Sequence, residues 1–118
     1  APGVQADDDL IRPQRTVLKL SVYPSSTTGI DARPLRTATL TCDPDGGTHP
    51  GPREACALLA RVGGDFTRLD LGLTPCPRIY QPVTAVEEGT WQGRRVAYRK
   101  VYSNECVLLS ATGPVFKF

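Results

Sequence analysis

Four cysteines constrain the fold of this 118-residue chain more than any other feature of its sequence. They are Cys42, Cys56, Cys76 and Cys106. An even number of cysteines in a small chain is typical of a disulfide framework, and the residues alone leave three pairings open. A zinc site is not indicated, because no two cysteines have only two to four residues between them and His49 is the one histidine. We therefore expect two disulfides, with no metal and no cofactor.

The start of the sequence and its net charge indicate the compartment and the partners of the protein. The sequence begins at Ala1 and contains no Met, which removal of a secretory signal peptide would explain. Disulfides persist in oxidising compartments, so a secreted, extracellular protein is expected. The net charge of +2 is too balanced for the basic stripe of a nucleic-acid-binding protein. No apolar run approaches the roughly 18 residues of a membrane-spanning helix. We expect neither nucleic acid nor a membrane as a partner.

Hydrophobic periodicity predicts a single α+β domain built on an antiparallel sheet. Alternating apolar and polar residues indicate strands, and an i, i+3, i+4, i+7 pattern indicates a helix. The predicted strands are Thr16–Val22, Arg36–Cys42, Val83–Val86, Trp91–Tyr102 and, as a last short candidate, Val115–Phe118. The predicted helix is Arg53–Val62, followed by a short helical turn from Asp65 through Arg68. Residues 1–15 show no period and are expected to form a flexible arm before the domain at 16–118.

Catalytic machinery is not indicated by the polar residues. His49 lies in the Pro/Gly-rich segment 43–52, where we expect a turn residue and not a general base. Glu87, Glu88 and Gly89 form the predicted turn of the strand hairpin, so the two carboxylates are expected to be solvated. The chain is therefore not expected to be an enzyme.

The most informative segment is rich in proline and centred on a basic residue. It consists of Thr74, Pro75, Cys76, Pro77, Arg78, Ile79, Tyr80, Gln81 and Pro82. Each proline fixes its own φ and pushes the preceding residue towards extended backbone, so an exposed, extended loop is predicted. Its cysteine ties it covalently to another part of the chain. A rigid, extended segment with Arg78 at its crest has the shape of a protease substrate. The alternative is a connecting loop with an incidental arginine.

Several short blocks along the chain, in order and with all four cysteines in place, carry a family resemblance. They are Thr39-Leu40-Thr41-Cys42, Gly47-Thr48-His49-Pro50, Ala55-Cys56, Val62-Gly63-Gly64-Asp65, Cys76-Pro77, Trp91-Gln92-Gly93-Arg94-Arg95-Val96, Ser103-Asn104-Glu105-Cys106 and Val115-Phe116-Lys117-Phe118. Together they resemble the Streptomyces subtilisin inhibitor family, which consists of secreted bacterial inhibitors of serine proteases. The resemblance runs from about residue 16 to the last residue and leaves residues 1–15 out.

The resemblance implies a more detailed fold than periodicity does. It implies a five-stranded antiparallel sheet with two helices packed on it, and a homodimer formed through the sheet. It also implies the disulfides Cys42–Cys56 and Cys76–Cys106. The reactive-site bond of the family follows a Cys-Pro-X sequence, which here places it between Arg78 and Ile79.

The resemblance also implies a function and its partners. Family members can carry Met before the reactive bond, which suits subtilisin, whereas Arg78 suits trypsin-like enzymes. Members with a basic residue there commonly block both trypsin and subtilisin, and some also block small zinc metallopeptidases. Asn104 is expected either to support the loop backbone from behind or to serve as a turn amide. The alternative function is a secreted, disulfide-stabilised binding module without inhibitory activity.

Overall fold

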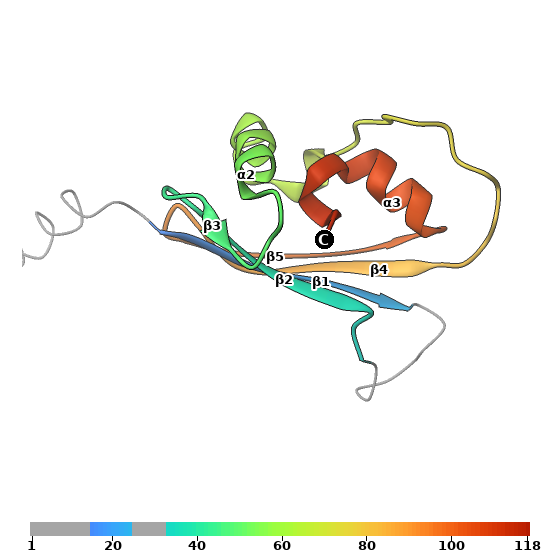
Figure 1. Ribbon diagram of the computed structural model, residues 1–118, viewed down its shortest axis with the longest axis horizontal. Coiled ribbons are helices and arrows are strands. Elements are labelled where there is room, and N and C mark those ends of the chain that lie inside the picture. The colour runs from blue at the N-terminus through green and yellow to red at the C-terminus, as the bar shows by residue number, and fades with distance from the viewer. Residues whose placement is uncertain (1–14, 25–32) are drawn as a thin grey trace, which may run out of the picture.

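A computed structural model describes residues 15–24 and 33–118 of the chain. Its strands are β1 (Thr16–Pro24), β2 (Arg36–Cys42), β3 (Gly46–Gly47), β4 (Val83–Trp91) and β5 (Arg94–Tyr102). They form one antiparallel sheet in the order β3-β2-β1-β4-β5. The helices α2 (Pro52–Arg61) and α3 (Glu105–Thr112) lie on one face of this sheet (Figure 1). Two short 3₁₀ segments, η1 (Phe66–Arg68) and η2 (Gly113–Phe116), complete the domain. The expected α+β fold, with five strands and two helices, is confirmed.

The central strand β1 shows why alternation predicts the sheet correctly. Leu18, Leu20 and Val22 are completely buried beneath the helices, whereas Lys19 between them is exposed on the other face. Side chains along a strand point alternately to opposite faces, so one face of β1 belongs to the core and the other does not. The neighbouring β2 follows the same rule, because its threonines point away from the core.

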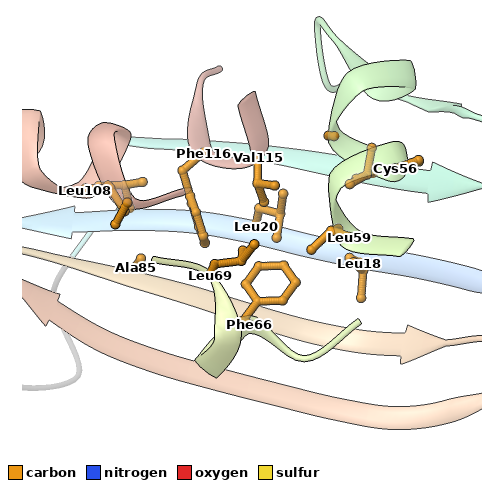
Figure 2. Close-up of a cluster of buried hydrophobic side chains, with 14 of the residues drawn as sticks. Leu18, Leu20, Cys56, Leu59, Phe66, Leu69, Ala85, Leu108, Val115 and Phe116 are labelled. Carbon is orange, nitrogen blue, oxygen red and sulfur yellow. The ribbon is translucent and has the colours of Figure 1, made fainter. Parts of the chain in front are cut away.

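The hydrophobic core lies between the sheet and the helical layer. Figure 2 shows Leu18 and Leu20 of β1 beneath side chains that come from every helical segment. Those side chains include Leu59 of α2, Phe66 of η1, Leu69, Leu108 of α3, and Val115 and Phe116 of η2. Each helical segment is therefore positioned by the same apolar layer, which is the main source of folding free energy in a domain of this size.

Helix α2 follows its sequence signals closely. Pro52 occupies its first turn, where the missing backbone N–H has no intrahelical role, and Gly63 with a positive φ of 64° follows its end. Its inward face carries Cys56, which is bonded to Cys42 of β2 with a Cα–Cα separation of 5.8 Å. The disulfide therefore joins the helix directly to the sheet.

The predicted turn of the β4–β5 hairpin is wrong. Glu87, Glu88 and Gly89 lie inside β4, and the chain reverses at Gln92 and Gly93. Both of these residues have positive φ, of 48° and 82°, as the tight turns of β-hairpins require. Gly89 serves a different purpose, because a Cβ at this position would lie 2.0 Å from the carbonyl oxygen of Val17. Glycine is therefore required at position 89 because β4 and β1 approach each other closely, and it does not mark a turn.

The end of the chain also differs from the prediction. Residues 113–116 form η2, and the candidate strand Val115–Phe118 is not formed. Val115 and Phe116 are both completely buried, which an alternating strand at a sheet surface would not allow. Of the predicted arm 1–15, only Arg15 belongs to the described residues, and its carbonyl accepts a hydrogen bond from Gly93 N–H (2.9 Å). In the described part of the chain, no helix combines the length and apolar character that a membrane crossing needs.

Candidate functional site

The proline-rich segment forms an exposed loop between η1 and β4. In Figure 1 it arches around the first turn of α3 before the chain enters β4. Its exposed residues are Thr74, Pro75, Pro77, Arg78, Ile79, Tyr80 and Gln81, whereas Cys76 and Pro82 are half-buried. Ile79 and Tyr80 are 53% and 79% exposed, and these two large side chains are neighbours in the loop. The loop therefore presents side chains that the fold itself does not use.

A buried amide lies directly behind the crest of the loop. Asn104 is only 7% exposed, and its Nδ2 donates hydrogen bonds to the carbonyl oxygens of Pro77 (3.2 Å) and Ile79 (2.8 Å). Its Oδ1 accepts a hydrogen bond from Val107 N–H (2.9 Å), which caps the N-terminus of α3. Asn104 thus contacts the backbone of the loop with its Nδ2 and caps α3 with its Oδ1, so it is a helix N-cap and not a turn amide. The carbonyl groups on either side of Arg78 are fixed by one side chain.

A disulfide fixes the loop two residues before Arg78. Cys76 is bonded to Cys106 in the first turn of α3, with the two Cα atoms 5.8 Å apart. Both disulfide pairings that the family resemblance implied are confirmed. Because Asn104 and Cys106 are two residues apart, the covalent and polar supports of the loop originate from the same helix end.

The two flanks of the loop are hydrogen-bonded by residues that sequence reasoning missed. The Ser110 hydroxyl accepts a hydrogen bond from Thr74 N–H (3.0 Å) and donates one to the Thr74 carbonyl (2.9 Å). The Ser110 carbonyl accepts from Leu73 N–H (3.0 Å). After the crest, Gln81 N–H donates to the Ser103 carbonyl (2.9 Å). The loop is thus anchored before, behind and after Arg78.

The contacts of Ser110 were missed because the periodicity of the sequence did not locate α3. Its start and stop signals are present in the sequence. Asn104 is a favourable N-cap, Glu105 supplies an acidic group to the first turn, and Gly113 followed by Pro114 ends the helix. With the helix assigned, Ser110 would have been placed near its C-terminal end, although its contact with the loop depends on the tertiary fold.

The single histidine is a structural residue. His49 is 4% exposed, and its Nδ1 accepts a hydrogen bond from Gly51 N–H (2.9 Å). The ring proton therefore lies on Nε2, which donates to the Val115 carbonyl (2.9 Å). Because backbone groups occupy both ring nitrogens, His49 connects the 43–52 segment to η2 and is not placed as a general base.

One cluster of potential metal ligands also has a structural explanation. Among the described residues, Cys42, Asp45 and Cys56 bring ligand-type atoms within 4.8 Å of one another. The two sulfur atoms are joined to each other, and a disulfide sulfur is not the thiolate that binds a metal. This cluster is part of the disulfide framework.

This arrangement of fold, disulfides and supported loop agrees with the relatives of the chain. The chain belongs to the Subtilisin inhibitor-like family, whose model matches residues 14–104. It is 45% identical to a subtilisin inhibitor of Streptomyces albogriseolus over an alignment of 120 residues, covering 100% of this chain and 81% of that protein. It is 40% identical to a trypsin inhibitor of Streptomyces longisporus, again covering 100% and 81%.

A solved structure supports the same assignment. Streptomyces caespitosus sermetstatin, determined in complex with Bacillus licheniformis subtilisin, matches this fold with a TM-score of 0.74 at 33% identity. The match covers 88% of this chain and 99% of that one. The family consists of protease inhibitors and not of enzymes, as the sequence analysis expected.

Proposed function

We propose that this chain is a secreted inhibitor of trypsin-like and subtilisin-like serine proteases, with Arg78–Ile79 as its reactive-site bond. The observation that carries the proposal is the position of Asn104, which binds the carbonyl oxygens on both sides of Arg78 while the Arg78 side chain stays exposed. A connecting loop has no need for such support at its crest. A substrate-like inhibitor needs it, because the backbone must be ordered before the protease binds.

The supports of the loop lower the free energy that binding requires. Ordering a flexible side chain at an interface costs about 0.5–1.5 kcal/mol, and each residue of backbone costs about 1–2 kcal/mol. In this loop three prolines, one disulfide and the hydrogen bonds of Asn104 and Ser110 have already ordered the backbone. More of the contact energy is then left as affinity.

Arg78 supplies the specificity of the proposed complex. Its guanidinium is permanently charged and planar, and it matches a carboxylate at the bottom of a trypsin-like pocket. Subtilisin-like enzymes offer a broader, apolar pocket, in which the aliphatic part of the arginine side chain packs. A subtilisin inhibitor and a trypsin inhibitor among the relatives support these two classes of target.

The same anchors explain why cleavage does not end inhibition. Hydrolysis adds water across the Arg78–Ile79 bond and creates a new carboxylate and a new amine. The carboxylate side stays bonded through Cys76, and the amine side stays attached through Gln81 and the start of β4. Because the two new ends remain close together, the peptide bond re-forms in the protease site.

Substitution of Arg78 tests the proposal. Arg78→Met should weaken trypsin inhibition by about 30-fold or more, because it removes the charged anchor of the interface. It should leave subtilisin inhibition intact or improved. Arg78→Lys serves as the control and should keep trypsin inhibition within about tenfold, because it retains a positive charge. Inhibition constants against both enzymes provide the measurement.

The site of proteolytic nicking separates the inhibitor from its alternative. Wild-type protein held with trace trypsin should yield a species cut only between Arg78 and Ile79, while most of the enzyme stays inhibited. A binding module without inhibitory activity would be digested at that position. Full trypsin inhibition by Arg78→Met, or a first cut after Arg68 or Arg94, would show that the reactive bond is elsewhere. Adding a zinc metallopeptidase to the assays tests the remaining prediction from the resemblance.

The outer face of the sheet supports a homodimer. This face, opposite the helices, carries a shallow concavity of about 830 Å³ whose lining includes Val17, Lys19, Thr39 and Glu88. Val17 is 41% exposed and Val101 of the edge strand 56% exposed, so apolar surface remains uncovered. A two-fold pair through this face would cover it and would leave both loops free. Each dimer would then bind two protease molecules.

Light scattering at micromolar concentration measures the assembly. The expected mass is that of a dimer, and Val17→Lys should shift the population towards monomer because it puts a charge into apolar surface that the dimer would bury. Arg78→Met, which lies outside the outer face, should remain dimeric. A wild-type protein that stays monomeric would rule out the dimer without affecting the assignment of the reactive bond.

A further inference from the structure

One arginine lies on the core side of the sheet. Arg36 begins β2, and the alternation along this strand places its side chain with Ala38 and Leu40 and not with the threonines. The strand register puts Arg36 at the end of the sheet where β5 ends and α3 begins (Figure 1). Charged side chains on a core face are rarely left without partners, so the contacts of Arg36 are informative.

The Arg36 guanidinium joins three separate segments. It forms an ion pair with the Glu105 carboxylate in the first turn of α3. Its Nη2 also donates to the Phe116 carbonyl of η2 (3.5 Å), and its Cζ lies 5.6 Å from the centre of the Phe118 ring. Within residues 15–24 and 33–118 this is the one ion pair. The Arg36 side chain is 24% exposed, so solvent screens the pair less than it would at the open surface.

Aromatic rings fix the position of Arg36 in turn. The Phe118 ring beneath the guanidinium packs against His49 and Phe116, with ring centroids 5.8 Å and 6.1 Å away. The Nε of Arg36 is buried and has no hydrogen-bond partner among the described residues. Because an unpaired buried donor lowers stability, the other contacts of the guanidinium must offset this cost.

Glu105 lies between the two residues that hold the proposed reactive loop. Asn104 before it donates to the loop carbonyls, and Cys106 after it carries the disulfide to the loop. All three belong to the N-cap and the first turn of α3. Helix ends fray more readily than helix centres, and a frayed first turn would displace both anchors. The order of the loop therefore depends on how firmly this turn is held.

Few contacts attach this turn to the rest of the domain. Val107 is half-buried at the edge of the core, and Leu108 is the first completely buried residue of the helix. The side-chain bonds of Asn104 and Cys106 lead to the loop or stay within the helix. Among the described residues, the pair with Arg36 is the one polar side-chain contact between this turn and the sheet.

We propose that Arg36 is a positioning residue for the reactive loop, and that it acts through Glu105 on the two loop anchors of α3. The inference rests on the proposed function, because it gives Arg36 a role in keeping the Arg78–Ile79 bond inhibitory. Arg36 does not touch the protease. It keeps the first turn of α3 helical and fixed to the sheet, so that the amide and the disulfide behind the loop hold their places.

Amide hydrogen exchange tests the position of the turn without a protease. Val107 N–H binds the Asn104 side chain, and Gln81 N–H binds the Ser103 carbonyl, so both amides report on contacts of this turn. Arg36→Met keeps an unbranched apolar side chain but removes the pair. It should speed exchange at both amides about fivefold, the effect of a well-formed ion pair, and leave the β1 amides unchanged.

Trypsin inhibition shows whether the loop depends on the turn. Arg36→Met should weaken inhibition about fivefold and speed hydrolysis after Arg78 by a similar factor. Glu105→Gln should have the same effect. The double variant should be no weaker than either single variant, because the two residues act as one pair. Arg36→Lys keeps a charge opposite Glu105 without the planar guanidinium and should recover part of the loss.

Arg53→Met and Leu59→Ala are the matched controls. Arg53 is exposed in the first turn of α2 and forms no ion pair in the described part of the chain, so its substitution changes the net charge equally. Leu59 is completely buried on α2, and its truncation should lower stability more than Arg36→Met does. Both controls should inhibit trypsin like the wild type at a temperature where unfolding curves show them folded.

Three results would overturn the positioning role. Wild-type exchange, inhibition and hydrolysis in Arg36→Met would show that the loop needs only its own anchors. Additive losses in the double variant would show that the two residues act separately. A loss of inhibition in Leu59→Ala as large as that in Arg36→Met would show that general stability controls the loop. None of these results changes the assignment of the reactive bond, which Arg78→Met tests by itself. If that bond is elsewhere, the exchange rates still decide whether Arg36 holds α3.

Discussion

The sheet–helix core and the proposed reactive loop are held in place by different interactions. In the core, apolar side chains from β1 and every helical segment fill the space between two layers. In the loop, Ile79 and Tyr80 remain mostly exposed, and a disulfide with a few hydrogen bonds from α3 fixes the backbone. If apolar burial ordered the loop, its side chains would be covered by the core and could not contact a partner. Polar and covalent anchors order the backbone and leave the side chains free for a partner.

The two disulfides follow the same division. Cys42 and Cys56 are each 6% exposed and join β2 to α2 within the core. Cys76 and Cys106 are half-buried and join the loop to the start of α3. One bond therefore connects two elements of the core, and the other fixes the loop to α3.

The largest effect on stability is expected in the core. Phe116 is completely buried and packs against Phe66 with ring centroids 5.9 Å apart. Phe116→Ala should lower the free energy of unfolding by about 3–5 kcal/mol, because it removes apolar contacts and leaves a cavity. Urea denaturation measures this loss. The folded fraction should still inhibit trypsin with the wild-type constant.

Ile79→Ala is the matched truncation in the loop. Because Ile79 is exposed, its stability change should stay within about 0.5 kcal/mol. Trypsin inhibition should nevertheless weaken, since Ile79 follows the proposed reactive bond. A large stability loss in Ile79→Ala would mean that the loop contributes to the core, and the distinction between the two regions would fail.

Removal of each disulfide should separate stability from inhibition. In the chain-entropy model a loop of about 15 residues contributes roughly 3 kcal/mol, and one of about 30 residues somewhat more. The Cys42→Ser/Cys56→Ser and Cys76→Ser/Cys106→Ser variants should therefore lose comparable stability. Inhibition of trypsin should fall more in the second variant, which should also be cleaved faster after Arg78. Unfolding curves and inhibition constants at a temperature where both variants are folded provide the comparison.

The outcome that contradicts this expectation is simple to recognise. If loss of Cys42–Cys56 weakened inhibition as much as loss of Cys76–Cys106, the loop geometry would depend on the core and not on its own anchors. Peptide mapping of the wild-type protein checks the premise and should recover only these two pairings.

The sequence predicted the regions whose pattern is local. Strand β1 and helix α2 show clear periods of two and 3.6 residues, so their limits were close to those observed. Prolines alone indicated an extended loop around Arg78, because their effect on φ does not depend on the fold. The disulfide pairing could not be derived in this way and came from the family resemblance.

The sequence failed where tertiary contacts decide. Glu87, Glu88 and Gly89 have the composition of a turn, but Gly89 is required by the close approach of β1, and Glu87 is buried in the sheet. Helix α3 lies between the end of β5 and η2, and its mostly apolar residues give little amphipathic contrast. The contact of Ser110 with Thr74 joins positions 36 residues apart and leaves no local signal.

The most specific effect is expected at Asn104, where the two regions meet. Its Oδ1 caps α3, and its Nδ2 binds the carbonyls of Pro77 and Ile79. Asn104→Asp keeps a favourable N-cap but replaces the donor with an oxygen that repels both carbonyls. Stability should change by less than that of Asn104→Ala, which loses the cap as well, at about 1 kcal/mol for the cap alone. The loop should nevertheless lose its support in both variants. Trypsin inhibition should therefore weaken to a similar extent, and hydrolysis after Arg78 should become faster in each. If Asn104→Asp inhibited trypsin like the wild type and resisted cleavage equally well, the amide would serve only the helix, and the disulfide with the prolines would be sufficient to order the loop.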